Sequence, residues 1–174
     1  MRHRKRGRKL GVSPSHRKAM GRNLVQALID QERIVTTVEK AKQFQPIAEK
    51  VVHLGKLVAS IKEDGDAKQK AQRLNYMRRA IALIGSRSLQ LPVTSTEVTG
   101  EGKDKVTKTR KVASTTLQKL VKDIGPRYLA RGDKKERNGG YTRIVRLARR
   151  RLGDNASQCL LELTEAPWTK IEKA

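Results

Sequence analysis

The feature that most constrains this chain is the positive charge at its N-terminus. Residues 1–23 contain nine Lys or Arg and two His, and no Asp or Glu occurs before Asp30. A segment of this kind cannot be buried in a core, because desolvating so many like charges costs more free energy than packing returns. It must face solvent or a polyanion.

The rest of the chain has the same bias. Its 174 residues include 40 Lys and Arg against 17 Asp and Glu, a formal charge of +23. Self-repulsion at this density destabilises a compact state, so we expect a polyanionic partner. Nucleic acid is the first candidate, since phosphate neutralisation releases condensed counterions. An anionic membrane surface is the alternative.

Catalytic signatures are scarce. The single cysteine, Cys159, excludes a disulfide within the chain and a Cys-based zinc site. His3, His16 and His53 lack metal-ligand spacing, and no phosphate-binding Walker loop occurs. No stretch approaches the ~20 apolar residues of a membrane span. We therefore expect no enzyme activity, cofactor, small-molecule substrate or membrane-spanning segment.

Apolar residues at helical spacing predict four helices. The first begins near Ser13, with either Ser13 or Ser15 as the N-cap and Pro14 as a first-turn proline. The second follows the capping-box pattern from Thr36 to Glu39. The third spans 67–84, and the fourth is ended by Gly125 and Pro126. The positions assigned to the core are Met20, Leu24, Ala27 and Leu28, then Ala41, Phe44, Ala48, Val51, Val52 and Gly55, then Ala71, Leu74, Met77 and Ile81, and finally Leu117, Leu120, Val121 and Ile124.

Two regions are predicted to be strands. "RIVTT" at 33–37 is short and β-branched, and "GGYTRIVRLARRR" alternates before the turn sequence "GDNA" and a return strand, "SQCLLELTEA". The order α-β-α-α-α-β-β predicts an α+β domain with helices packed on one face of a small mixed sheet.

The composition also suggests how the chain is divided. Residues 1–12 are expected to form an extended basic arm that binds nucleic acid, and residues 13–165 a single domain. Residues 86–112 are rich in Ser, Thr, Gly and Lys, which predicts a flexible loop or loose hairpin in a partly ordered surface insertion. Residues 166–174 are expected to be a polar tail.

The late basic stretch permits two interpretations. Tyr141 follows a Gly pair and is placed either to stack on a base or, more commonly for such a tyrosine, half in the core. The arginines after it either extend a basic face across the sheet or are solvated individually. They are Arg143, Arg146, Arg149, Arg150 and Arg151.

Five separated stretches resemble one family when taken together. They are "MRHRK", "PSHRKAMGRNL", "IVTTVEKAK", "GPRY" and "GGYTRI" with its following "GDNA". In order and approximate spacing they are similar to the bacterial-type large-subunit ribosomal protein seventeen family, from Met1 to about Leu163. The resemblance implies a structural constituent of the cytoplasmic large ribosomal subunit, supporting its assembly and translation. The implied partners are ribosomal RNA and neighbouring ribosomal proteins, with no membrane partner.

The resemblance also implies three groups of RNA-binding residues. The N-terminal group is Arg2, His3, Arg4, Lys5, Arg6, Arg8, Lys9, Ser15, His16, Arg17 and Arg22. The group at the strand–helix junction is Thr36, Thr37, Lys40 and Lys42, where a helix N-terminus can receive a phosphate. The late group is Arg127, Arg131, Gly140, Tyr141, Thr142 and Arg143.

The chain departs from the family pattern in places, and an alternative function stays open. "TTVEKAK" has Glu39 where the family often has a first-turn proline, extra residues precede the Gly pair, and residues 86–112 have no counterpart with a role. Because the resemblance starts at Met1, we expect a mature N-terminus and no transit peptide, although an organelle-encoded copy would look the same. The alternative is a free-standing nucleic-acid-binding regulator, which would bind duplex DNA about as well as ribosomal RNA.

The arm yields a prediction. We expect residues 1–12 to be disordered in the free protein and to order on ribosomal RNA, because phosphate contacts offset the entropy lost. Hydrogen exchange measured without and with RNA checks this. Amides of the arm that are already protected in the free protein would contradict it.

Overall fold

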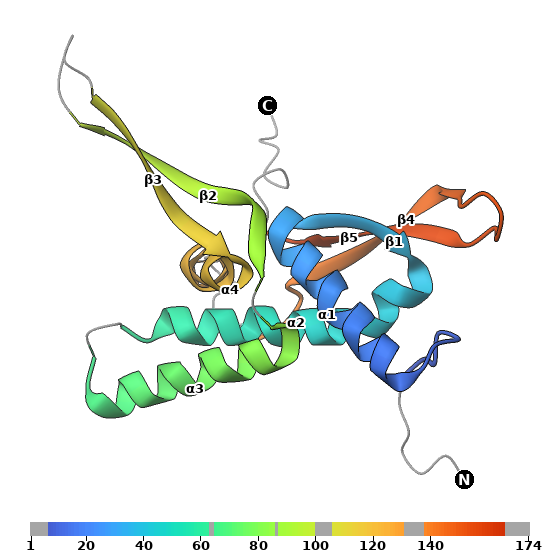
Figure 1. Cartoon of the computed structure of the whole chain (residues 1–174), viewed down its shortest axis with the longest axis horizontal. Helices are drawn as coiled ribbons and strands as arrows, with labels where there is room; N and C mark the ends of the chain where they lie inside the picture. Colours follow the sequence, from blue (N-terminus) through green and yellow to red (C-terminus); the bar gives the residue numbers. More distant parts are fainter. Residues whose placement is uncertain (1–6, 63–64, 86, 100–105, 131–137, 166–174) are drawn as a thin grey trace.

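The computed structural model describes residues 7–62, 65–85, 87–99, 106–130 and 138–165 (Figure 1). It is an α+β fold, as expected. The predicted tail, residues 166–174, lies outside the described residues. In chain order the elements are α1 (Pro14–Gln31), β1 (Arg33–Thr37), α2 (Val38–Ser60), α3 (Ala67–Ile84), β2 (Ser88–Thr99), β3 (Val106–Thr115), α4 (Thr116–Lys119), the π-helix η2 (Leu120–Ile124), α5 (Gly125–Leu129), β4 (Thr142–Arg150) and β5 (Ser157–Leu163).

The helix starts were predicted with mixed success. Of the two predicted N-cap candidates, Ser13 caps α1 by accepting a hydrogen bond from the His16 backbone N–H, with Pro14 in the first turn. The capping box predicted at Thr36 is wrong. β1 continues through Thr37, so Thr37 is the N-cap residue of α2, and its side chain makes no capping bond.

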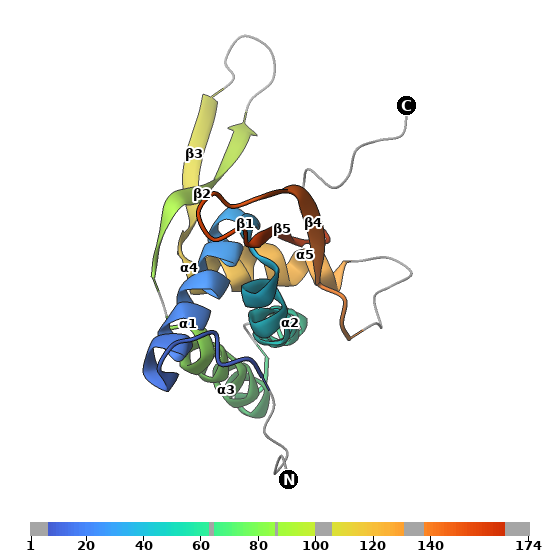
Figure 2. The same cartoon turned by 90° about the vertical axis from the view of Figure 1, so that its right-hand side faces the viewer.

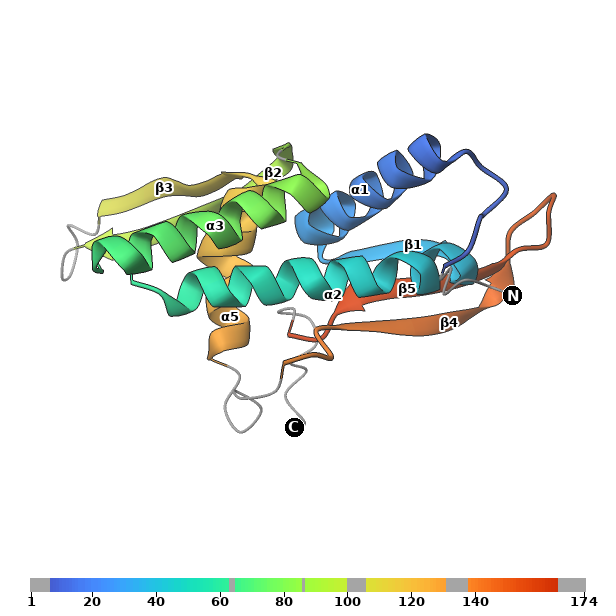
Figure 3. The same cartoon turned by 90° about the horizontal axis from the view of Figure 1, so that it is seen from below.

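The main sheet has the strand order β1-β5-β4, and both pairings are antiparallel. The predicted mixed sheet is therefore wrong, because β5 returns from a hairpin and runs opposite to both of its neighbours. Helices cover one face of this sheet, with α1 beside β1 (Figure 3). The other face carries Val35 and Val145, which are 50% and 43% exposed.

The insertion contains a second sheet. Strands β2 and β3 form an antiparallel ribbon, paired from Ser88↔Thr115 to Thr99↔Val106, that projects from the body of the molecule (Figures 1 and 2). The predicted element order lacked these two strands, although a loose hairpin was one of the two expectations. Hydrophobic alternation against a core, the usual strand signal, is weak in this Ser-, Thr- and Lys-rich stretch.

The fourth predicted helix does not end at Gly125 and Pro126. The chain stays helical through α4, the π-helix η2 and α5, and Pro126 is the second residue of α5. Gly125 serves packing instead. A Cβ built on it would lie 2.5 Å from the Gly55 carbonyl oxygen of α2.

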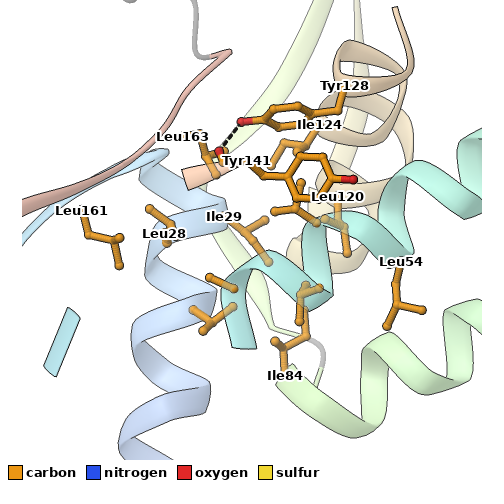
Figure 4. Packing of buried hydrophobic residues seen from close by; sticks show 14 of the residues in the cluster. Leu28, Ile29, Leu54, Ile84, Leu120, Ile124, Tyr128, Tyr141, Leu161 and Leu163 are labelled. Atoms are coloured by element: carbon orange, nitrogen blue, oxygen red, sulfur yellow. Dashed lines mark hydrogen bonds between the residues drawn. The ribbon is translucent and has the colours of Figure 1, made fainter. Parts of the chain in front are cut away.

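The core lies where α1, α2, η2, α5 and β5 meet (Figure 4). All six predicted core positions of α2 are buried. Of the core positions predicted for α1 only Leu28 is buried, beside Val25 and Ile29, which were not predicted. The predicted face of α3 is wrong, because α3 buries only Ala80 and Ile84. Each of these two helices has apolar residues on more than one side, and its tertiary neighbours select the buried side. Among the positions predicted for the core, Met20, Leu24 and Ala27 are half-buried, and Ala71, Leu74 and Ile81 are exposed.

The contact between the two glycines predicts the effect of a small substitution. Gly125→Ala should lower the free energy of unfolding by about 1–3 kcal/mol, because the new methyl group overpacks against Gly55. Helix propensity alone would raise it by up to about 1 kcal/mol. Urea unfolding decides between these, with Ala71→Gly on exposed α3 calibrating the propensity effect. A stabilised Gly125→Ala variant would contradict the close packing.

Candidate nucleic-acid interface

The described part of the N-terminal arm is not extended. Positive φ angles at Leu10 (57°) and Gly11 (65°) turn the chain before α1. The Arg8 backbone N–H donates to Oε1 of Gln43 at 2.5 Å, and Nη1 of Arg17 donates to the Lys9 carbonyl at 3.0 Å. Residues 7–12 therefore lie against α1 and α2. The predicted RNA-binding residues Arg2, His3, Arg4, Lys5 and Arg6 lie outside the described residues.

Two predicted groups meet beside this turn. Arg8 from the N-terminal group and Lys42 from the strand–helix junction line one surface hollow, together with Gly7, Gln43 and Pro46. Both cations are exposed, as is Lys9. No carboxylate lines this hollow, so it offers an anion two positive charges with no competing acid.

Members of the same two groups also meet in a second groove. His16 on α1, Thr36 on β1 and Lys40 on α2 line the space between α1 and β1. His16 is exposed, whereas Thr36 and Lys40 are half-buried. Thr37 is only 9% exposed, which leaves its side chain little contact with any ligand.

The N-terminal group also includes residues that bind the protein itself. Ser15 is exposed, with its hydroxyl 3.3 Å from that of Ser13. Arg22 donates from Nη2 to the Ala82 carbonyl at 3.1 Å and so joins α1 to α3. Part of its hydrogen-bonding capacity is therefore used within the fold.

Arg127 is an internal ion-pair residue. Its guanidinium donates to both carboxylate oxygens of Glu32, at 2.6 and 3.2 Å, and to Asp123 at 2.8 Å. Burial opposes its charged form, but the hydrogen bonds to Glu32 and Asp123 outweigh that effect and raise the pKa of Arg127. With 19% of its side chain exposed, the arginine is committed to the fold. Arg131 lies outside the described residues.

Tyr141 and Thr142 are buried. Tyr141 is 1% exposed and packs edge-on against Tyr128 with ring centroids 5.1 Å apart. The Glu49 carboxylate accepts hydrogen bonds from both backbone N–H groups, at 3.1 Å from Tyr141 and 2.7 Å from Thr142. Of the two interpretations of Tyr141, the structure agrees with the core one, and its ring is not accessible to a base. Gly140 is exposed at φ +66° and forms the turn into β4.

The hairpin β4–β5 keeps its arginines outside. Arg143 and Arg33 both bind Glu162, which is 1% exposed, while about half of each arginine side chain remains exposed. Arg151 pairs with Asp154, and its hydrogen bonds lower the pKa of that carboxyl to about 2. Arg146, Arg149 and Arg150 also lie on this hairpin. All three are exposed, and none takes part in the ion pairs with Glu162 and Asp154.

The hairpin tip and the N-terminal turn project from the same end of the molecule (Figures 1 and 3). Helix α3 carries further exposed cations, which were not among the predicted RNA-binding residues: Lys68, Lys70, Arg78 and Arg79. The absence of any Asp or Glu between residues 67 and 84 was the signal that could have identified them.

Other kinds of site find no support within the ranges that the structure describes. No cluster of three or more His, Cys, Asp or Glu there is arranged to hold a metal ion. None of the described helices is both long and apolar enough to cross a membrane.

Comparison with known proteins decides the family. Residues 20–164 match the model of ribosomal protein L17. This chain belongs to the ribosomal protein L17 family. Its relatives include the large ribosomal subunit protein bL17 of Desulfotalea psychrophila, 38% identical over 94% of this chain and 89% of the relative. The bL17 proteins of Geobacter metallireducens (38%, over 99% and 70%) and Lactobacillus johnsonii (39%, over 90% and 97%) are similarly close.

Membership in the L17 family confirms the resemblance noted from the five sequence stretches. It makes this chain a structural component of the ribosome and not an enzyme.

The cluster around Tyr141 predicts a pH dependence. His53 Nδ1 lies 3.0 Å from the Tyr141 hydroxyl, and burial, with a smaller effect of Lys56, lowers the pKa of His53 below its ordinary 6.5. Just below pH 6.5 the unfolded chain therefore binds a proton that the folded chain does not. The free energy of unfolding should decrease as the pH falls through this range.

The matched variant is His53→Gln, which removes the titrating group and keeps a polar side chain near Tyr141. Urea unfolding at pH 7.5 and 5.5 should show a smaller loss of stability in the variant than in the wild type. Equal losses would show that His53 does not titrate differently on folding.

Proposed function

We propose that this protein, as a constituent of the large ribosomal subunit, binds ribosomal RNA through one end of the molecule. We call this surface the basic end and define it as Arg8, Lys9 and Lys42 beside the N-terminal turn, with Arg146, Arg149 and Arg150 on the β4–β5 hairpin. All six are exposed. The observation that carries the proposal is the hollow in which Arg8 and Lys42, 34 positions apart, meet without a carboxylate.

Residues 1–6 extend the basic end in sequence. They contribute four further Lys or Arg directly before Gly7, which lines the same hollow. Phosphate neutralisation by such a run supplies sequence-independent affinity. This supports the expected RNA-binding arm, with residues 7–12 as its anchor on the domain.

The expected mode of recognition follows from the chemistry of the basic end. It consists of Arg and Lys side chains, and none of its members is aromatic. Arginine forks suit bidentate contact with phosphate. Folded ribosomal RNA is recognised mainly through shape and backbone, so we expect phosphate contacts to predominate. The protein then acts in the cytoplasm by holding RNA segments in place, which supports subunit assembly and translation.

Arg127, Tyr141 and Thr142 are not part of the proposed interface, because their polar groups are used within the fold. Arg143 contributes through the exposed half of its side chain. The alternative of a free-standing DNA-binding regulator shares the electrostatics of the basic end, but membership in the L17 family argues against it.

The proposal predicts a salt signature. Replacing Arg8, Lys9 and Lys42 together by Ala should weaken binding to protein-free large-subunit RNA. The slope of log K against log salt should decrease by about two to three, since each phosphate contact contributes about 0.7–0.9. Filter binding at several salt concentrations measures the slope.

The matched control removes the same charge from α3 through Lys68→Ala, Lys70→Ala and Arg79→Ala. It should change the slope by less than the first variant does. If both variants lose affinity equally, binding depends on net charge alone and the basic end is not the interface.

A further inference from the structure

Strand β1 has one edge without a partner strand in the described part of the chain. It ends the order β1-β5-β4 and pairs only with β5. The Leu163 N–H donates to the Glu32 carbonyl at 3.0 Å, so Glu32 and Leu163 form a hydrogen-bonded pair. Such pairs alternate along an antiparallel ladder. The backbone N–H and C=O groups of Val35 therefore point toward the open edge.

A groove runs along this edge. It has a volume of about 540 Å³ and is lined by residues of α1 and β1. Its apolar lining comes from Met20, Leu24 and Ala27 on α1 and from Ile34 and Val35 on β1. The three α1 residues are the ones that the sequence pattern assigned to the core and that the fold leaves half-buried.

The groove and the edge together suit an extended polypeptide. A strand added to β1 would pair with its outward backbone groups and place alternate side chains against the apolar lining, which is how strand addition gives affinity and specificity. The five residues of β1 span about 17 Å, room for a segment of about five residues. RNA has no regular row of alternating donors and acceptors to match this edge, and its phosphates gain nothing from an apolar wall.

Charge narrows the choice of segment. His16 and Lys40 are the ionisable side chains that line the groove, and no carboxylate accompanies them. A second copy of this chain is a poor occupant, because its net charge is +23 and like charges across an interface are repulsive. A carboxylate on the incoming segment would find Lys40 beside the C-terminal end of β1.

We propose that the open edge of β1 binds an extended, carboxylate-bearing segment of a neighbouring large-subunit protein by strand addition. The site uses the backbone of Val35, the apolar lining of the groove and the charge of Lys40. It is distinct from the basic end: Arg8 and Lys42 line a different hollow. One face of the α1–β1 unit then meets protein while the basic end meets RNA.

A photo-cross-linker tests the occupant. Benzoylphenylalanine introduced at Leu24, in the groove, is irradiated in assembled large subunits, with the same probe at exposed Leu74 on α3 as the matched position. The expected result is an adduct from position 24 to one ribosomal protein, mapped by mass spectrometry to an extended acidic segment. Adducts only to RNA, only to a second copy of this chain, or to nothing would overturn the proposal.

A backbone substitution tests the pairing itself. Val35→Pro removes an N–H that points to the open edge, and proline is tolerated on edge strands, whereas Val35→Thr keeps this N–H. The proline variant should fold, as thermal unfolding will show, and the adduct yield from position 24 should fall about fivefold, as expected for one lost hydrogen bond. The threonine variant should keep its yield, as both variants should keep their affinity for ribosomal RNA. An unchanged yield in a folded Val35→Pro variant would show that the neighbour does not pair with β1.

Discussion

The buried carboxylate of Glu32 is the interaction on which the arrangement of elements most depends. Glu32 links α1 to β1 in a left-handed conformation, with φ 61°, and its backbone carbonyl pairs with β5. Its side chain, in a residue 5% exposed, binds Lys119 of α4 at 3.2 Å and Arg127 of α5 at 2.6 Å. One residue thus connects α1, the sheet, α4 and α5. Replacing both cations would leave this carboxylate buried without compensation, and breaking a buried ion pair in that way costs about 3–5 kcal/mol in comparable cases.

Other acids in this strongly basic chain have the same kind of internal role. Glu49 accepts both backbone N–H groups at the start of β4, and Glu162 accepts Arg33 and Arg143 across the three strands. Asp30, 7% exposed, faces Arg87. With only 17 acids available, those used inside cannot neutralise cations outside. The hollow at Arg8 and Lys42 is consistent with this, since it contains no acid.

This distribution explains what the sequence could and could not predict. The α+β class, the start of α1, β1, the buried stripe of α2 and the β4–β5 hairpin each follow from local spacing or turn residues, and all are present. The buried sides of α1 and α3 depend on which neighbour packs against them, as do the continuation past Gly125 and the antiparallel pairing of β1 with β5. Arg127 and Arg22 looked like RNA ligands because a Lys or Arg in sequence does not reveal whether its partner is a phosphate, a carboxylate or a carbonyl within the fold.

The buried members of the late motif still matter for the surface. Glu49 holds the backbone of Tyr141 and Thr142 on α2, and Tyr128 donates its hydroxyl to the Tyr141 carbonyl at 2.6 Å (Figure 4). These bonds set where β4 begins, and the regular register through Arg146 then sets the position of that arginine opposite Cys159. A motif that resembles an RNA-binding sequence thus combines two roles along one strand. Its first residues fix the strand to the core, and its later arginines then project in a defined direction, as the proposed RNA interface requires.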